Sequence, residues 1–301
     1  MRSKMALINI GSQKQLFVDD YLIESMSDTK QVMNPAEKVE NNPVIRPEKP
    51  WEGNDVRFRN IIFDEVDQVF KLWYDAKMHS AQQGDGEIIV KGEFDDEVRT
   101  CLAVSEDAVN WERPNLGMVE FGGSKNNNIL APDQQLPLLA GQRDSNTYFF
   151  QDNHEQDPSK RYKGFVRTGS TTTPGMQFHL YFSKDAFNWV PYENNPVIDT
   201  APRVGRWGPT NFMGWDSVRG VYAAHMENCL HRRSPLSKRL IGRAESTDLI
   251  NWSEPETILL PDQDDSPDTE FYAMPTIVYE NIYVGMPWIF STTNTTHHPE
   301  L

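Results

Sequence analysis

Five short stretches of the sequence carry side chains suited to acid–base or binding chemistry. They are Asp55 with Arg57 and Arg59, Arg143 with Asp144, Trp207 with Asn211, His225 with Glu227, and Asp268 with Glu270 and Tyr272. Two carboxyl groups serve as general acid and base when one holds a proton and the other does not. Arginines on one face of a strand orient a carboxylate or a phosphate. Because the same residue types also form turn caps and structural ion pairs, the elements that position them must be predicted first.

The pattern Ser-x-Asp-x-x-Asn-Trp occurs three times and indicates a repeated unit. Its copies run from Ser105 to Trp111, from Ser183 to Trp189, and from Ser246 to Trp252. Each copy follows a short apolar run, and Asp, Asn and Ser side chains bond nearby backbone amides in turns. The Trp then begins the next extended segment as a large buried anchor. Each copy therefore predicts a corner between two strands.

Four predicted hairpins accompany these corners. They pair residues 60–63 with 69–74, 147–150 with 162–166, 212–215 with 221–224, and 276–279 with 283–286. A hairpin, a third strand, a corner and a fourth strand make a four-stranded antiparallel unit. Such units recur roughly every sixty to ninety residues with no long helical period between them, which predicts an all-β fold, a β-propeller of four-stranded blades.

The repeat predicts a single domain over residues 1–301. Its expected parts are a strand at 15–24, blade one at about 55–120, blade two at about 143–198, blade three at about 207–260 and a partial blade four at about 268–301. The hexapeptide Glu-Asn-Asn-Pro-Val-Ile, which begins at Glu40 and again at Glu193, reports the same periodicity. The corner of the fourth unit would fall after the last residue, so we expect a propeller without the end of blade four and without a fifth blade. Its open edges would invite association.

Composition excludes several classes of partner. The net charge of −15 argues against nucleic acid and anionic membranes. Cys101 and Cys229, the only two cysteines, lie in strand-like runs and are expected as buried thiols without a disulfide. The histidines have no metal-ligand spacing, so neither a metal nor a cofactor is expected. No signal peptide or membrane span is evident, which predicts a cytoplasmic chain, and the oligomeric state stays open.

The corners, the Asn-Pro-Val-Ile segments and the opening residues 15–23 resemble the five-bladed propeller glycosidases, the superfamily of invertases, levansucrases and arabinanases. The resemblance covers nearly the whole chain and is nearest to a branch similar to glycoside hydrolase family 32. It implies five blades and a carbohydrate substrate bound in a central funnel. It also implies three carboxylates at the starts of innermost strands, which act as nucleophile or base, as proton donor to the leaving oxygen, and as an orienting group.

By this resemblance, Asp55 is the expected base or nucleophile, Asp144 the orienting carboxylate and Glu270 the general acid. Arg143–Asp144 is similar to the Arg-Asp-Pro motif of the family, with Ser145 in place of proline. The family's acid/base glutamate has no counterpart at the start of blade three, and its nearest replacements are Glu227 and Glu270. The expected substrate-binding residues are Arg57, Arg59, Arg143, Trp207, Asn211, His225, Glu227, Asp268 and Tyr272.

Two other functions fit the same scaffold. In a glycoside phosphorylase, inorganic phosphate replaces water as the attacking group and needs a basic cluster, for which the arginines are candidates. In a non-catalytic carbohydrate-binding propeller, the blade-three glutamate is not needed. The sequence therefore favours a glycoside hydrolase and leaves both alternatives open.

Overall fold

The computed structural model describes residues 9–12, 14–32, 34–77, 98–130, 147–168, 176–200, 207–208, 210–230, 238–280 and 282–292. These residues form antiparallel β-sheets, and the helical segments among them are two 3-10 turns, η1 (Pro50–Glu52) and η2 (Pro158–Lys160). The predicted all-β class is therefore confirmed. Within the described ranges, no helix has the length and hydropathy needed to span a bilayer.

Three sheets repeat one meander, in which each strand pairs antiparallel with the next. The first contains β1 (Asp55–Asp64), β2 (Val69–Lys77) and β3 (Val98–Ser105). The second contains β4 (Thr147–Gln151), β5 (Tyr162–Thr168), β6 (Gln177–Ser183) and β7 (Trp189–Pro191), with β8 (Ile198–Asp199) also on β6. The third contains β9 (Thr210–Asp216), β10 (Val221–Leu230), β11 (Lys238–Ser246) and β12 (Glu256–Leu259). The first three predicted hairpins are thus confirmed by the register of their strands.

The last four strands form one long interrupted hairpin. They are β13 (Thr269–Ala273), β14 (Thr276–Tyr279), β15 (Ile282–Gly285) and β16 (Trp288–Ser291). β14 pairs with β15 and β13 pairs with β16, so the two arms break at residues 274–275 and 286–287. The fourth predicted hairpin is confirmed.

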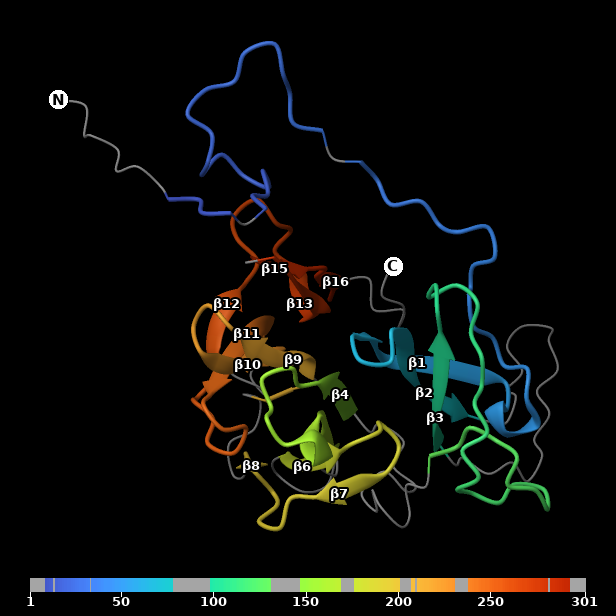
Figure 1. The fold of residues 1–301 in the computed structure, drawn as a ribbon. Coiled ribbons are helices and arrows are strands. Elements are labelled where there is room, and N and C mark those ends of the chain that lie inside the picture. Colours follow the sequence, from blue (N-terminus) through green and yellow to red (C-terminus); the bar gives the residue numbers. More distant parts are fainter. Residues whose placement is uncertain are drawn as a thin grey trace.

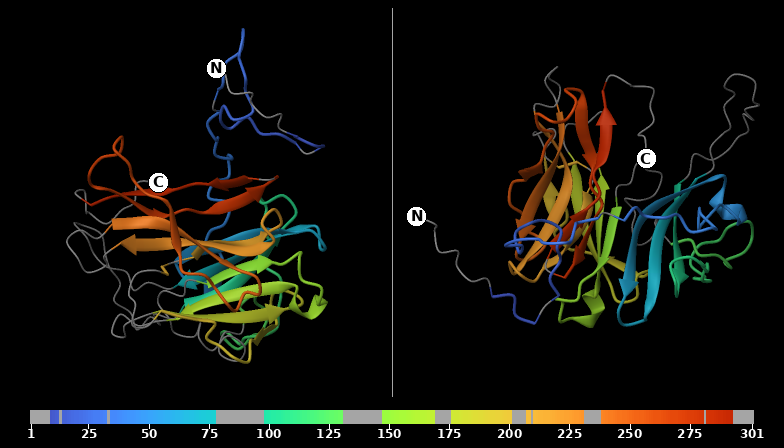
Figure 2. Two further views of the ribbon diagram at one scale, coloured as in Figure 1. Left: turned by 90° about the vertical axis from the view of Figure 1, so that its left-hand side faces the viewer. Right: turned by 90° about the horizontal axis from the view of Figure 1, so that it is seen from above.

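The sheets follow one another around a common centre (Figure 1), and their first strands lie toward that centre. β1 contacts β4, β4 contacts β9, and β9 contacts β14. Figure 2 shows the third sheet between the second sheet and the C-terminal hairpin. This order brings the first strands of successive sheets toward the middle of the molecule.

The three Ser-x-Asp-x-x-Asn-Trp copies form the same corner, as predicted. In each, one aspartate oxygen accepts the backbone N–H of the residues two and three positions later, at 2.8 and 2.7 Å for Asp107, 3.2 and 2.8 Å for Asp185, and 2.9 and 2.8 Å for Asp248. The residue after each aspartate has a positive φ, 60° at Ala108, 75° at Ala186 and 65° at Leu249. These local hydrogen bonds hold a non-glycine residue in a backbone region that it rarely adopts.

The turns of the first three hairpins are also bonded to the following sheet. A turn aspartate accepts the hydroxyl of a tyrosine from the next sheet: Asp64 from Tyr162, Asp152 from Tyr222 at 2.8 Å, and Asp216 from Tyr283 at 2.6 Å. A basic residue of its own sheet pairs with the same carboxylate: Lys71 at 2.6 Å, Lys163 at 3.2 Å and Arg243 at 3.0 Å. These bonds fix the position of each sheet relative to the next.

Aromatic side chains fill the space between sheets. Between the first and second sheets, Phe149 contacts Trp73 and Trp189 with ring centroids 5.0 and 4.9 Å apart. Between the second and third sheets, Trp207 lies 5.5 Å from Phe178 and 5.7 Å from Trp252. Trp189 is the buried anchor that the repeat predicts, whereas Trp111 and Trp252 are only partly buried.

Three details of the sequence-based picture need correction. The first sheet has three strands where four are predicted, because the segment after its corner pairs with β3 only at isolated bridges, such as the one between Val104 and Glu112. Residues 15–24, predicted as a strand, follow an irregular path, and Phe17, Val18 and Tyr21 are exposed there. Alternating apolar residues make a strand only where a sheet edge accepts their backbone hydrogen bonds, and this segment has no such pairing. Cys101 is buried as predicted but Cys229 is only half-buried, and no disulfide joins them.

Candidate functional site

Asp55 lies at the first residue of β1, opposite Lys77 of β2. Its carboxylate accepts a hydrogen bond from Arg57 Nε at 2.8 Å, and both side chains are partly exposed. Residues two apart on a strand share a face, which explains why these neighbours meet. Asp55 is thus accessible for chemistry, but Arg57 is already paired with a carboxylate.

Arg59 belongs to a more buried ion pair. Its guanidinium contacts Asp75 of β2, whose side chain is fully buried, and Asp75 also accepts a hydrogen bond from Thr100 at 3.4 Å. A β-bulge between Phe58 and Asn60 shifts the register at this point. Arg59 therefore holds β1 against β2, and it presents its charge to a buried carboxylate.

Glu227 of β10 and Glu270 of β13 meet at one arginine. Arg239 of β11 donates to Glu270 Oε2 from its NH1 at 2.7 Å, and its Nε lies 3.8 Å from Glu227 Oε1. Both glutamate side chains are nearly buried, at 10% and 6% exposure, whereas that of Arg239 is 37% exposed. Burial disfavours the charged guanidinium, but the hydrogen bond to Glu270 and the charges of both glutamates outweigh it and raise the pKa of Arg239.

The start of the third sheet lies directly against Glu227. Gly208 N donates to the Glu227 carbonyl oxygen at 2.8 Å. A Cβ on residue 208 would lie 2.6 Å from Glu227 Cβ, so only glycine permits this approach. The sequence lacks a carboxylate at this strand start, and Glu227 reaches the same place from the neighbouring strand.

Tyr272 contributes to the same cluster through its ring. The Arg239 guanidinium carbon lies 5.5 Å from the Tyr272 ring centroid and 5.2 Å from that of Phe290. These distances suit cation–π contacts. Tyr272 is partly exposed, so one end of the Glu227, Arg239, Glu270 and Tyr272 group, here called the arginine cluster, is open to solvent.

His225 is buried between the third sheet and the C-terminal hairpin. Its ring nitrogens lie 3.3 Å from Thr276 Oγ1 and 3.4 Å from Arg243, and its ring contacts Phe212 and Tyr283. Burial first, and then the charge of Arg243, lower the pKa of His225 to about 4. The imidazole is therefore neutral near pH 7, in a packed environment two residues from Glu227.

The remaining predicted residues have varied surroundings. Asp268 accepts hydrogen bonds from Ser266 and Ser291 and so joins the two arms of the C-terminal hairpin. Trp207 is 6% exposed, and its ring is covered by other aromatic residues in the core between sheets. Asn211 lies in β9, and nothing further is described of its side chain. Arg143 and Asp144 lie outside the described residues.

The structure brings together two predicted acids, Glu227 and Glu270, and leaves Asp55 in a separate ion pair. It adds Arg239 of the third strand β11, which the sequence analysis missed because the candidates came from strand starts and from the second strand. The signal available in the sequence was a pair of basic residues, Lys238 and Arg239, opening an apolar third strand. Among the described residues, no group of three His, Cys, Asp or Glu side chains is arranged to hold a metal ion.

Solved structures of glycoside hydrolases are similar to this chain in fold. One glycoside hydrolase shares 10% identity, covers 83% of this chain and 70% of its own, with a TM-score of 0.48. A β-fructofuranosidase from Schwanniomyces occidentalis, complexed with fructosyl-erythritol, shares 15% identity over 81% of this chain and 41% of its own, with a TM-score of 0.46. An N-acetylgalactosamine deacetylase from F. plautii shares 12% identity over 78% of this chain and 61% of its own, with a TM-score of 0.44.

This chain spans between 34% and 41% of the length of the fructofuranosidases that it matches. No protein-family model matches the sequence, and no curated protein matches it.

Proposed function

We propose that this protein is a glycoside hydrolase that binds an oligo- or polysaccharide at the centre of a five-bladed propeller. The described sheets would form blades one to three and the first hairpin of blade four. Asp55 would act as base or nucleophile, Asp144 would orient the sugar, and Glu270 would protonate the leaving oxygen.

One observation supports this proposal above others. The start of the third sheet lacks the acid/base glutamate that the resemblance implies, yet Glu227 abuts Gly208 there and shares Arg239 with Glu270. Two carboxylates beside one guanidinium form a group that one added proton makes neutral. Arg239 donates to Glu270 at 2.7 Å and lies 3.8 Å from Glu227, so it would hold both side chains in place. Arg239 would be a positioning residue in this scheme.

The phosphorylase alternative gains less support from the described contacts. A phosphate site needs basic side chains that are available to the anion. Arg57 and Arg59, two of the three arginines considered for this role, already pair with Asp55 and Asp75. Water is therefore the proposed attacking group.

Turnover of neutral oligosaccharides with and without phosphate tests this function. The full chain would be incubated with fructo- and arabino-oligosaccharides, and the released reducing sugar would be quantified. We expect release that is independent of phosphate, and strongly reduced release by Asp144→Asn, which is nearly isosteric. Release that requires phosphate would establish a phosphorylase. Binding without any release would establish a carbohydrate-binding protein.

A further inference from the structure

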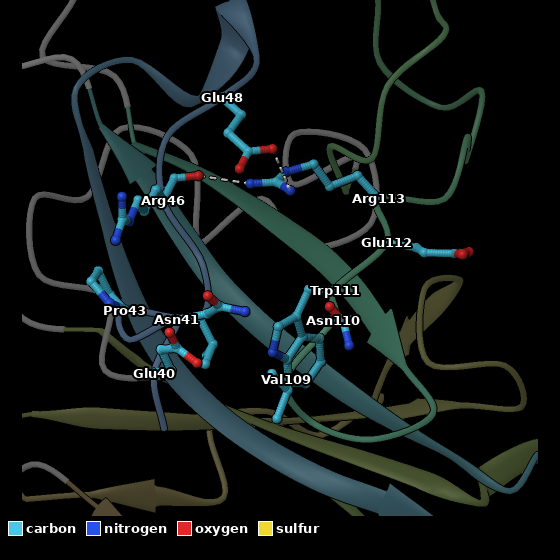
Figure 3. Close-up of a pocket in the computed structure, with 11 residues that line it drawn as sticks. Glu40, Asn41, Pro43, Arg46, Glu48, Val109, Asn110, Trp111, Glu112 and Arg113 are labelled. Atoms are coloured by element: carbon cyan, nitrogen blue, oxygen red, sulfur yellow. Dashed lines mark hydrogen bonds and ion pairs between the residues drawn. The ribbon is translucent and has the colours of Figure 1, made fainter. Parts of the chain in front are cut away.

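A cavity lies far from the arginine cluster, at the outer side of the first sheet. Its volume is about 520 Å³, and it opens between residues 40–48 and residues 109–113, which include the end of the first corner (Figure 3). This volume is within the usual range of small-molecule sites. The cavity is called the outer pocket below.

The outer pocket extends along the first sheet, and Asp55 is not among its lining residues. Its Arg113 end bonds Glu52, three residues before Asp55 in the chain. Because neither Asp55 nor Glu270 lines the outer pocket, a ligand there would contact other side chains than the proposed catalytic ones.

Several polar side chains of the outer pocket are available to a ligand. Glu40, Asn41 and Arg46 are exposed, and their side chains make no hydrogen bond or ion pair with any described residue. Arg113, by contrast, is held by Glu52 at 2.6 Å and by Glu48 at 3.4 Å. The available groups thus include a carboxylate that accepts hydrogen bonds, a guanidinium that donates them and an amide that does both.

Trp111 forms part of the opposite wall, beside Asn110 (Figure 3). Its Nε1 donates to the Ala108 carbonyl oxygen at 3.1 Å, which fixes the ring. The equivalent Trp189 is buried, and Trp252 packs against Phe165 and Trp207. Of the three corner tryptophans, Trp111 is the one that lines this cavity, where a fixed aromatic ring can contact the apolar face of a ligand.

The two identical hexapeptides differ in what they contact. In the second copy, the Asn195 side chain bonds both backbone groups of Leu180, at 2.8 and 2.9 Å, and Val197 N donates to Phe178 O at 2.9 Å. The second copy is thus fastened to β6. No side-chain hydrogen bond is recorded for Asn42, the matching residue of the first copy, among the described residues. The first copy instead presents Glu40 and Asn41 to the outer pocket.

We propose that the outer pocket is a non-catalytic binding site for a neutral sugar unit. The Trp111 ring can contact an apolar face of a ligand, and the surrounding carboxylate, amide and guanidinium groups can bond hydroxyl groups. Together they suit a ligand that has many hydroxyl groups and no charge. Three glutamates and two arginines line the pocket, so an anionic sugar would be disfavoured. The choice of ligand class rests on the proposed function, because the same carbohydrate would supply both sites.

Calorimetric titration of the full chain tests this inference. The probes are neutral fructo- and arabino-oligosaccharides of three to five units, and a trigalacturonate as the anionic comparison. The pocket variant combines Glu40→Gln with Asn41→Ala, both at exposed positions. The matched control combines Glu193→Gln with Asn194→Ala in the identical hexapeptide. We expect the pocket variant to bind a neutral probe about tenfold more weakly, as for the loss of two hydrogen bonds, and the control to match the wild type.

The two proposals fail separately. Unchanged affinity in the pocket variant, no binding of any probe, or binding of trigalacturonate as tight as that of a neutral probe would overturn the outer pocket as a neutral-sugar site. Sugar binding that depends on Glu40 and Asn41 without any hydrolysis would uphold it while overturning the hydrolase. Hydrolysis by the pocket variant at the wild-type rate, together with weakened binding, would support both.

Discussion

Single residues decide the chemistry that is possible in the arginine cluster. Glu227 and Glu270 are nearly buried, and burying a charge without a partner is costly. Arg239 offsets this cost for both carboxylates while remaining partly exposed, so a bound ligand can reach the group. A leucine at position 239 would leave two acidic side chains close together without their counter-charge, whereas a lysine would keep the charge and lose the fork of the guanidinium.

His225 makes the stability of the fold depend on pH at the residue scale. The pKa of His225 is lowered to about 4 in the folded state, chiefly by burial and then by Arg243, while the charge of Asp216 opposes this. The unfolded chain takes up the proton at higher pH, so stability is lost as the pH falls from about 6.5 toward 4. We expect the free energy of unfolding to fall by about 2 kcal/mol between pH 7.5 and 5 from this residue.

Chemical denaturation at the two pH values checks the His225 prediction, with His225→Gln as the comparison. The variant should show a smaller difference between pH 7.5 and 5 than the wild type. Carboxylates with lowered pKa values, such as Asp248 at about 2, contribute below this window. Identical pH dependence in the two proteins would exclude His225 as the cause.

At the scale of elements, each corner is held by hydrogen bonds between residues of the Ser-x-Asp-x-x-Asn-Trp motif itself. Asp185 accepts two backbone N–H groups and the Asn188 side chain, and Ser183 bonds Asp185. We expect Asp185→Ala to lower the free energy of unfolding by about 1–2 kcal/mol, because these turn donors lose their acceptor. Thermal or denaturant unfolding measures this change. Lys184→Ala, at the exposed neighbouring position, should cost much less, and equal costs would contradict the assignment.

The tyrosine–aspartate bonds join elements over longer distances. Tyr222 donates to the buried Asp152, which keeps Lys163 as a partner when the hydroxyl is removed. We expect Tyr222→Phe to cost about 2 kcal/mol of unfolding free energy, as for a hydrogen bond to a charged group. Denaturant unfolding would show this. By strand register, the residue of the first sheet that corresponds to Tyr222 is Phe70, so a phenylalanine ring fits this position. An unchanged unfolding midpoint would mean that the Tyr222–Asp152 hydrogen bond does not contribute to stability.

These elements also show which features can be predicted from sequence. The corners and hairpins were predicted because their hydrogen bonds are made within a few residues, through side chains that the motif names. The strand at 15–24 failed because strand formation depends on a partner edge elsewhere. The arginine cluster joins β10, β11 and β13, and such long-range contacts leave no local pattern, so Glu227 and Glu270 were found as candidates and Arg239 was not.

At the scale of the whole molecule, the C-terminal hairpin exposes a large apolar surface. Ile277, Val278, Trp288 and Ile289 are between 39% and 56% exposed. Exposed apolar strands favour association. We expect the protein to self-associate as its concentration rises, which light scattering after size-exclusion chromatography would measure. Ile277→Lys with Ile289→Lys should reduce this association, whereas Val218→Lys, in the turn between β9 and β10, should not. A monomer at all concentrations would contradict this prediction.

The overall arrangement places the first strands of successive sheets side by side (Figure 1), so that residues far apart in sequence can act on one substrate. The arginine cluster depends on a further contact of the C-terminal hairpin, because β13, which carries Glu270, lies against β10 and β11, which carry Glu227 and Arg239. The proposed hydrolase depends on this convergence more than on any single motif.

Hydrolysis of a neutral oligosaccharide by the wild type and by Glu270→Gln is therefore the decisive comparison. We expect the wild type to release sugar and the variant to lose about a hundredfold or more of the rate, as for the removal of a general acid. The unfolding midpoint should change little, because the amide is nearly isosteric with the carboxyl group. A variant that keeps most of the wild-type rate, with the same fold stability, would remove Glu270 from the catalytic group and contradict the proposed mechanism.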